Sequence, residues 1–462
     1  MKWPLQSRSS GVSIQPPSRI QPQGRPRAFP LRYLLVLWLA GLSAVAFLDR
    51  TNISIAGIAI GKEFAIDKVH LGWIISAFLV GYAGLQIPAG LLARRLGPRR
   101  ALALLGAWWG IFISLTACIP DHAAHALLLL VLLRFTLGAG EAVMYPATSQ
   151  FVERWFPVQE RGRANGIIFA GVGLGSGLTP PLVTAIILHH GWRASFWFSA
   201  AACSLAGLVW YIAARDTPEQ HAWLSSAERT LILRERRVVQ VDDSDTTRNG
   251  RRAVPWAAIL RSKAILAMVL SYFTYGYVAW IFFAWMYTYM AQVRGLNLKT
   301  SALYAALPFL AMTIGCLSGG VICDRITARF GLRAGRCVLP TISFALTASL
   351  LLLGSAAHQP RTAALLLACG AGSLYLAQSS YWAVCADIGG EFTSVVTGIV
   401  NMSGQLGGAC TASLTPLLAA HFGWEVSFIT AASLAGLGAL AWLWVDPNRH
   451  LLLPVASAVV NP

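Results

Sequence analysis

Long apolar runs alternate with short polar connections along most of the chain. An α-helix that crosses the hydrocarbon core of a bilayer needs about 20 mostly apolar residues, so each run is long enough for one crossing. We predict twelve transmembrane helices, over 31–58, 71–93, 100–119, 125–152, 164–187, 194–213, 264–291, 301–323, 335–356, 362–386, 394–420 and 425–445. The fold class predicted from this pattern is an all-α polytopic membrane protein.

The composition supports this interpretation and excludes several others. Of the 462 residues, 56% are hydrophobic and 12% are charged, whereas soluble globular domains carry about 25% charged residues. So few ionic groups leave too little polar surface to solvate a soluble particle. The composition therefore excludes a cytosolic enzyme, a disordered chain and a secreted disulfide scaffold.

The net charge of +17 reflects where the basic residues lie. In a soluble domain such an excess would suggest a nucleic-acid partner. Here Lys and Arg gather in alternate connections, whereas the connections near 120–125, 188–193, 357–361 and 421–424 hold at most one Arg each. Basic loops favour the cytoplasmic side, so both termini are predicted to be cytoplasmic. We expect the lipid bilayer, and no nucleic acid, as a partner.

The polar stretches divide the chain into five parts. We predict a disordered basic tail over 1–30, a six-helix bundle over 31–213, a cytoplasmic central loop over 214–263, a second six-helix bundle over 264–446, and a tail over 447–462.

The two bundles are predicted to be copies of one unit. His189-x-Gly191-Trp192 recurs as His421-x-Gly423-Trp424, an offset of 232 residues (421 − 189), and Gly90 and Arg95 recur as Gly320 and Arg325, an offset of 230. Agreement on one offset near half the chain length indicates a duplication. Two parallel repeats related by an axis along the membrane normal are typical of transporters whose substrate site lies between the halves.

Four ionisable residues lie inside the predicted spans. Asp49 and Arg50 are in the first span, and Arg134 and Glu141 are in the fourth. A charge at bilayer depth costs roughly 2.5–3.5 kcal/mol on insertion scales, and a functional role is the first hypothesis for it. Arg134 and Glu141 are seven residues apart, about two helical turns, so they share a face, which we expect to point into the bundle.

These four residues suggest an anion and proton site. Arginine remains charged and binds carboxylates through its planar fork, so Arg50 and Arg134 are predicted to bind an anion. A buried carboxylate can exchange an arginine partner for a proton, so Asp49 and Glu141 are predicted to carry protons. The alternative is a pair of static buried salt bridges that only hold helices together.

Other polar side chains in the spans could complete the cavity. These candidates are Tyr82 in the second span, Ser379 and Trp382 in the tenth, and Asn401 in the eleventh. For each of them the alternative is an ordinary helix–helix contact, because Tyr and Trp are common in spans and Ser or Asn often bonds another helix.

Several motifs together resemble the anion:cation symporter family of the major facilitator superfamily. Asp49-Arg50-Thr51-Asn52 is similar to its DR-x-N element, and Arg134-x6-Glu141 to its helix-four pair. The run 155–164, WFPVQERGRA, resembles its loop WFP-x-x-ERGRA. The resemblance implies that Arg50 and Arg134 bind the substrate carboxylate and that Asp49 and Glu141 are protonated during the cycle, with Glu141 favoured as the coupling site.

The resemblance also implies further site residues and a conformational latch. Tyr82, Ser379, Trp382 and Asn401 fall where the family places substrate-contacting groups. The latch loop reads G-x3-D-R-x-G-R-[RK] in the superfamily, and its Asp makes charge contacts in the closed state. The first copy keeps Gly90, Arg95 and Gly97 but has Arg94 and Pro98 at the acidic and a basic position, whereas the second keeps Gly320, Asp324 and Arg325.

These observations lead to one prediction of function and two rivals. We expect a monomeric proton symporter of the cell inner membrane that carries a small organic carboxylate by alternating access. A sugar acid is favoured over an aromatic acid as cargo. The proton is the coupling ion, and neither a cofactor nor a metal nor an enzymatic activity is expected. The rivals are an uncoupled facilitator of organic anions and a transporter-like ligand sensor.

Overall fold

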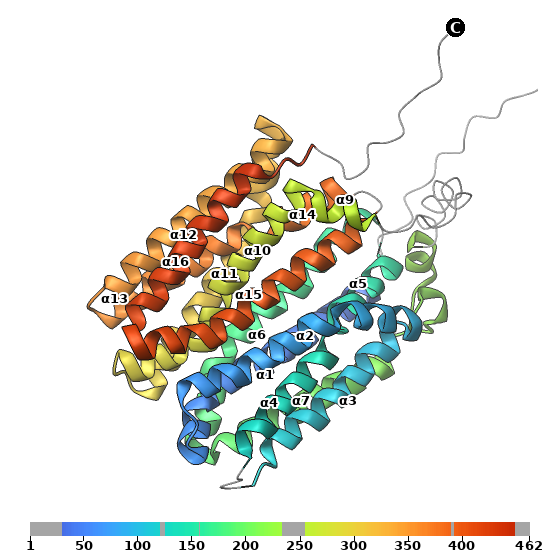
Figure 1. The fold of residues 1–462 in the computed structure, drawn as a ribbon. Coiled ribbons are helices and arrows are strands. Elements are labelled where there is room, and N and C mark those ends of the chain that lie inside the picture. The colour runs from blue at the N-terminus through green and yellow to red at the C-terminus, as the bar shows by residue number, and fades with distance from the viewer. Residues whose placement is uncertain (1–29, 121–124, 157, 233–254, 390–391, 449–462) are drawn as a thin grey trace, which may run out of the picture.

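The structure is a computed structural model that describes residues 30–120, 125–156, 158–232, 255–389 and 392–448. Within these ranges the regular structure is helical (Figure 1). The predicted tails over 1–30 and 447–462 lie almost wholly outside the described residues.

The first half, called the N-half, contains α1 (Leu31–Phe64), α2 (Lys68–Leu96), α3 (Pro98–Ala117), α4 (Ala126–Glu141), α5 (Met144–Trp155), α6 (Val158–His190) and α7 (Trp192–Ala213).

The second half, called the C-half, contains α10 (Lys263–Thr288), a π-turn (Tyr289–Val293), α11 (Leu298–Phe330), a second π-turn (Ala334–Val338), α12 (Leu339–Ala356), α13 (Pro360–Leu376), α14 (Gln378–Gly389), α15 (Thr393–Phe422) and α16 (Trp424–Ala441). Between the halves lie a 3-10 turn (Pro218–Gln220), a helical segment over 226–232 and α9 (Trp256–Arg261).

Eleven helical stretches of the described chain are long and apolar enough to cross a membrane. The twelfth predicted span corresponds to α15, which is not among the eleven although its 30 residues would reach about 45 Å. α15 carries many small and polar residues, and it packs lengthwise between α10 and α2 (Figure 1). α15 is less apolar than the eleven other stretches, as expected for a helix that contacts protein more than lipid.

Helix packing repeats in the two halves and confirms the predicted duplication. In the N-half α1 packs on α6, α2 on α4 and α3 on α7; in the C-half α10 packs on α15, α11 on α13 and α12 on α16. The interface between the halves repeats too, because α2 packs on α15 and α6 on α11.

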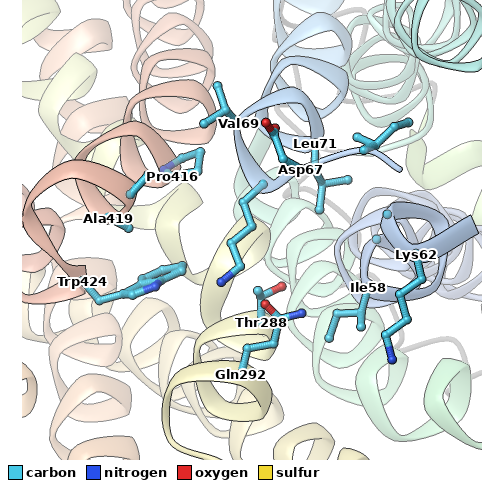
Figure 2. A pocket seen from close by; sticks show the side chains of 15 residues that line it. Ile58, Lys62, Asp67, Val69, Leu71, Thr288, Gln292, Pro416, Ala419 and Trp424 are labelled. Atoms are coloured by element: carbon cyan, nitrogen blue, oxygen red, sulfur yellow. The ribbon is translucent and has the colours of Figure 1, made fainter. Parts of the chain in front are cut away.

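The halves are joined at the end that carries the connection 65–67. Ser76 of α2 donates to the Ala409 carbonyl at 2.6 Å and lies 2.7 Å from the hydroxyl of Ser413 on α15. Thr184 of α6 bonds the Tyr287 hydroxyl of α10 at 3.2 Å. A cavity between the halves lies at this same end (Figure 2).

At the opposite, Arg-rich end, four glycines within the helices lie beside open space. Gly84 and Gly90 of α2, Gly166 of α6 and Gly398 of α15 have open space where a side chain would begin, with no atom of a neighbouring helix within 4 Å. The four glycines all lie in those parts of α2, α6 and α15 nearest the Arg-rich connections. The halves therefore close one end of the molecule and leave these helix faces unpacked at the other.

The predicted spans 125–152 and 362–386 are both broken rather than continuous. α4 ends at Glu141 and α5 begins at Met144, because Pro146 cannot donate a backbone hydrogen bond and its ring crowds the preceding turn. α13 ends at Leu376 and α14 begins at Gln378 around i→i−3 bonds at Ala377 and Ser380. Both breaks lie at the middle of a span, and predicted site residues adjoin each of them.

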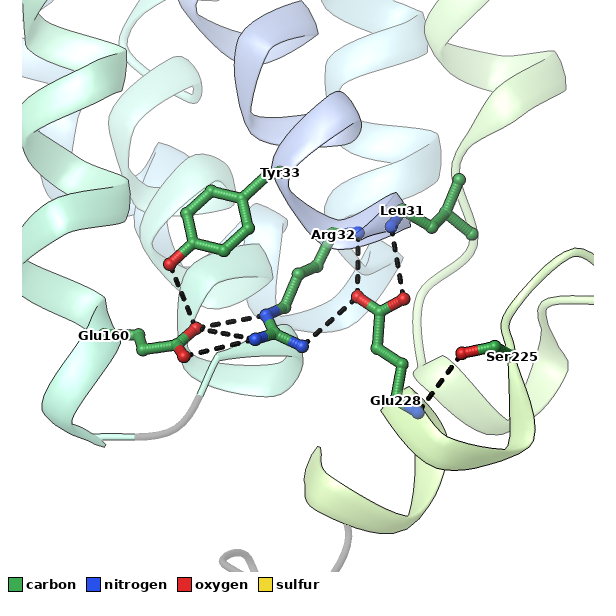
Figure 3. Close-up of polar contacts among 6 residues, drawn as sticks. All are labelled: Leu31, Arg32, Tyr33, Glu160, Ser225 and Glu228. Atoms are coloured by element: carbon green, nitrogen blue, oxygen red, sulfur yellow. Dashed lines mark hydrogen bonds and ion pairs between the residues drawn. The ribbon is translucent and has the colours of Figure 1, made fainter. Parts of the chain in front are cut away.

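The start of the predicted central loop is packed against the N-half (Figure 3). The Arg32 guanidinium lies between two carboxylates, with Nη2 3.0 Å from Glu160 and Nη1 3.3 Å from Glu228. Glu228 also accepts from the backbone N–H groups of Leu31 and Arg32 at 3.1 and 3.2 Å, which caps α1 with a negative charge. The described part of 214–232 is thus an anchored segment, while 233–254 lies outside the described residues.

Candidate functional site

The four charged residues predicted inside the membrane form two buried ion pairs. Arg50 contacts Glu141, with Nε and Nη2 both 2.6 Å from Oε1. Arg134 Nη1 lies 3.0 Å from Asp49 Oδ2. The arginines are 4% and 1% exposed, and both carboxylates are fully buried. Each arginine therefore faces protein rather than lipid, as the spacing of Arg134 and Glu141 predicts.

Both pairs join the fourth span to the first. Asp49 and Arg50 are consecutive on α1, so their side chains diverge and reach different levels of the facing helix. Arg134 lies two turns before Glu141 on α4, and each takes one of the α1 residues as its partner. Glu141 is the last residue of α4, where the helix breaks. Discontinuous helices near the midplane are typical of transporter binding sites.

Aromatic rings surround the two guanidinium groups. The Phe78 ring centroid lies 5.3 Å from Arg50 Cζ and 4.7 Å from Arg134 Cζ, so one ring contacts both cations. Phe47 and Tyr82 lie 4.5 and 5.0 Å from Arg50. Cation–π contacts of this kind stabilise a desolvated guanidinium without neutralising it. Arg50 can therefore remain in place when its carboxylate partner changes.

A buried indole completes the surroundings of Glu141. Trp109 Nε1 of α3 donates to Glu141 Oε2 at 3.1 Å. Glu141 thus has one oxygen toward Arg50 and one toward Trp109. If Oε1 left the arginine, the bond from Trp109 to Oε2 would still hold the carboxylate in place.

Asn52 fixes the charged segment of α1 against α7. Its amide nitrogen donates to Ser199 at 3.2 Å, and its amide oxygen accepts from Ser195 at 2.9 Å. All three side chains are buried. These bonds hold α1 in register one turn beyond Asp49 and Arg50.

The C-half residues predicted to contact substrate lie at the break between α13 and α14 and on α15. Ser379 Oγ and Gln378 Oε1 are buried and have no hydrogen-bond partner, although Gln378 Nε2 donates to the Tyr272 hydroxyl at 3.4 Å. Trp382 is half-buried, with its ring 5.5 Å from Tyr272. Asn401 is half-buried on α15. The C-half thus offers neutral polar atoms and aromatic rings near the boundary between the halves.

The two sides face each other across the boundary between the halves. Phe47 of α1, which contacts Arg50, lies with its ring centroid 5.5 Å from that of Phe283 on α10. Tyr272 of α10 stacks on Tyr275, with centroids 5.0 Å apart. A ligand held by the arginines would therefore meet an aromatic wall of the C-half.

The predicted latch residues lie at the Arg-rich end and differ between the halves. Asp324 is 81% exposed at its side chain and lies 3.7 Å from Arg336, which also contacts Asp387 at 3.1 Å. Arg325 and Arg95 are exposed, and Gly320 lies next to Ser379.

An acid from outside the motif lies at the N-half copy of the predicted latch. Gly97 has φ = +77° and precedes α3, where Asp216 accepts from the backbone N–H of Arg99 at 2.9 Å. A carboxylate from beyond α7 thus lies at this helix start, although Arg94 occupies the acidic position of the motif.

Sequence reasoning missed Phe78 and Trp109 as parts of the site. Phe78 precedes Tyr82 by four residues on one helix, so the two share a face and that spacing could have revealed it. The chain has 17 tryptophans, and Trp109 lies in an apolar span where nothing in the sequence sets it apart from the others. Within the described chain, no three His, Cys, Asp or Glu side chains are grouped so as to hold a metal ion.

Known transporters are similar to this chain over most of its length. A probable sulfoacetate transporter of Cupriavidus necator is 30% identical over 418 residues, which cover 90% of this chain and 94% of that protein. A probable L-galactonate transporter of Escherichia coli is 25% identical and covers 96% of each chain. A chloroplastic ascorbate transporter of Arabidopsis thaliana is 29% identical, covering 90% of this chain and 74% of that protein.

Solved structures show the same fold. A bacterial homologue of the human lysosomal transporter Spinster, in an inward-facing and unoccupied conformation, gives a TM-score of 0.71 at 15% identity, covering 91% of this chain and 99% of that one. A D-xylose–proton symporter gives a TM-score of 0.69 at 15% identity, covering 90% and 99%.

The family model of the Major Facilitator Superfamily matches residues 39–412. This range includes the two ion pairs, both helix breaks and the aromatic wall of the C-half. The chain therefore belongs to the Major Facilitator Superfamily, and it is a membrane transporter rather than an enzyme.

Proposed function

We propose that this protein is a proton-coupled symporter of a small organic carboxylate. The observation that carries the proposal is the double ion pair Arg50–Glu141 and Arg134–Asp49, buried at a helix break in the N-half. Fixed cations of this kind bind carboxylates, and a carboxylate displaced from its arginine by a substrate anion can take up a proton. Anion and proton would then occupy the site together, and their charges would balance.

Buried polar atoms of the C-half favour a polyhydroxylated acid as the cargo. Ser379 Oγ, Gln378 Oε1 and Gln405 Oε1 are buried without partners, and a buried acceptor gains when a hydroxyl donates to it. An aromatic acid would stack on Tyr272 and Trp382 but would leave these acceptors unpaired. The relatives named as galactonate and ascorbate transporters carry hydroxyl-rich anions. A sugar acid is therefore the proposed substrate.

The proposed cycle is a rocking of the two halves about the central site. Ser76–Ser413 and Thr184–Tyr287 close one end, and the unpacked glycine faces lie at the other. The Arg-rich connections support a cytoplasmic location for that second end. The proposal therefore includes cytoplasmic termini, a cell inner membrane location and a monomer as the working unit.

Uptake into liposomes tests the proposed function. Purified protein is reconstituted, and a labelled sugar acid such as galactonate is added with the outside at lower pH than the inside. Accumulation above the outside concentration is expected, and it should collapse when a protonophore removes the pH gradient. A labelled benzoate run in parallel decides between the sugar-acid and aromatic-acid alternatives.

The uncoupled facilitator is the rival that this experiment can favour. A facilitator would equilibrate the labelled anion without concentrating it, whatever the pH gradient. Equal uptake with and without the gradient would therefore contradict the symporter proposal while leaving an anion transporter.

A further inference from the structure

A cavity lies between the halves, at the end that carries the connection 65–67 (Figure 2). Its volume is about 520 Å³, within the range of small-molecule sites. α1 and α2 of the N-half form one wall, and α10, its π-turn, α15 and α16 of the C-half form the other. The four charged residues of the central site do not line it. We call this cavity the outer vestibule.

Two ammonium groups give the vestibule an excess of positive charge. Lys62, in the last turn of α1, and Lys68, the first residue of α2, both line the cavity. Asp67 lines it too, but its carboxylate accepts from the backbone N–H of His70 and lies 2.8 Å from His70 Nδ1. That acid therefore serves its own helix start, which leaves Lys62 and Lys68 as the basic residues that line the cavity.

Lys68 links the two walls. Its Nζ lies 5.8 Å from the ring centroid of Trp424, at the start of α16. A cation–π contact of this length is weak at an exposed site, so an anion can compete for the ammonium. The Trp424 ring and neighbouring apolar groups such as Ile58 and Pro416 would then flank the carbon skeleton of the anion (Figure 2).

The floor of the vestibule holds an unpartnered hydroxyl. Thr288 lines the cavity, is 1% exposed, and its Oγ1 has no hydrogen-bond partner. Gln292, one turn later, lines the same floor (Figure 2). A buried hydroxyl without a partner is costly unless a ligand or water bonds it. The cavity thus combines two cations, a free donor and an amide, which suits a carboxylate.

We propose that the outer vestibule is a second anion site, which holds a small carboxylate in front of the closed contact between α2 and α15. One wall belongs to the N-half and the other to the C-half. A rocking of the two halves that separates Ser76 from Ser413 would therefore also open the floor of the vestibule. An anion held there would be next to the path toward Arg50 and Arg134 when that contact opens. The identity of the cargo rests on the proposed function, whereas anion binding at Lys62 and Lys68 does not.

Chemical labelling tests the site without relying on transport. Pyridoxal 5′-phosphate forms a Schiff base with lysine amines, and borohydride traps it for peptide mass spectrometry. The full-length protein is placed in nanodiscs of zwitterionic lipid and labelled with and without gluconate. Gluconate is expected to protect Lys62 and Lys68 saturably and to leave Lys299 unprotected. Lys299 is the matched control, since it is exposed near the start of α11 and does not line the cavity.

Two further measurements distinguish anion binding in the vestibule from binding at the central site and from an effect of the lipid. In Arg134→Ala, which removes a cation of the central site, protection of Lys62 and Lys68 should persist even if transport is lost. When anionic phosphatidylglycerol is added to the nanodiscs, the lysines should stay reactive in the absence of gluconate. Equal protection of all three lysines, no protection, or protection by the lipid alone would each overturn the proposal.

A kinetic measurement gives the expected size of the effect. Lys68→Gln should raise KM for uptake from the vestibule side by about two- to fivefold, since a partly exposed ion pair contributes little. The kcat should not change, and Lys299→Gln should leave both parameters unchanged. A Lys68→Gln protein with wild-type KM would contradict a role of the vestibule in uptake.

Discussion

The centres of the two halves differ in chemistry although their helices pack in the same pattern. The N-half centre holds two arginines, two carboxylates and the Phe78 ring between the cations. The C-half centre holds tyrosines, Trp382 and neutral amide and hydroxyl groups. The two halves thus share one architecture and differ in the side chains that they place at their centres. The charged half suits anion and proton binding, and the neutral half suits recognition of the rest of the substrate.

Arg134→Ala should have the largest effect on this division. It leaves Asp49 buried without a partner, which costs on the order of 3–5 kcal/mol in comparable buried pairs, and it should lower anion affinity about 10- to 150-fold. Thermal unfolding and equilibrium binding of the labelled acid measure the two effects. Arg329→Ala, which removes an exposed arginine of α11, is the matched control. Retained affinity in a folded Arg134→Ala protein would remove Arg134 from the anion site.

Glu141→Gln should separate anion binding from proton coupling. The amide keeps an oxygen that can accept from Arg50 or Trp109, but it cannot take up a proton. Exchange of labelled for unlabelled acid should therefore persist, while accumulation driven by an acidic exterior is lost. Glu425→Gln, which neutralises a carboxylate in the first turn of α16, serves as the control. Normal accumulation by Glu141→Gln would exclude this residue from coupling.

Ser379→Ala should change recognition without changing coupling. Loss of one neutral hydrogen bond to a hydroxyl of the substrate is worth about 0.5–1.5 kcal/mol, so KM should rise by about two- to twelvefold. The number of protons moved per anion should stay the same. Ser318→Ala is the control, because Ser318 bonds only its own helix in the structure. A change in proton number for Ser379→Ala would show that the two halves do not divide the work in this way.

The smallest expected effect is a pH dependence of the stability of the anchored segment after α7. Burial lowers the pKa of His221 below its ordinary value of 6.5. At a pH between the lowered pKa of the folded segment and 6.5, the unfolded segment therefore binds more protons than the folded one. The segment is therefore most stable above pH 6.5 and loosens as the pH falls. Hydrogen exchange of 214–232, corrected for intrinsic rates, should rise at low pH in the wild type but not in His221→Asn. A pH-independent wild type would contradict this assignment.

The sequence was sufficient to predict the span pattern and the duplication. It was also sufficient to predict the four buried charges, because a charged residue within an apolar run is costly and therefore easy to recognise. It could not predict which arginine pairs with which carboxylate. Arg134 and Glu141 share a face, but partner choice depends on how α4 lies against α1. The two helix breaks were also missed. Pro146 marks the first in hindsight, whereas the second, at Ala377, has no proline to announce it.

The polar groups of the C-half show a different limit of sequence reasoning. Ser379 and Gln378 are unremarkable among the polar residues of a span, since Ser and Gln often bond a neighbouring helix. Only the packed structure reveals that Ser379 Oγ and Gln378 Oε1 are buried without partners. Asn52 is the opposite case, because its amide nitrogen and its amide oxygen each bond a serine of α7. A polar residue within a span therefore becomes a candidate ligand only when its partners are known.

The most direct test of the account is a simultaneous count of protons and anions in liposomes that contain the purified protein. A pH-sensitive dye trapped inside reports proton entry while the labelled sugar acid is measured in the same vesicles, with no pH gradient imposed. The account predicts that adding the acid outside acidifies the interior in the wild type and that Glu141→Gln moves the anion without protons. Anion entry without acidification in the wild type would contradict it.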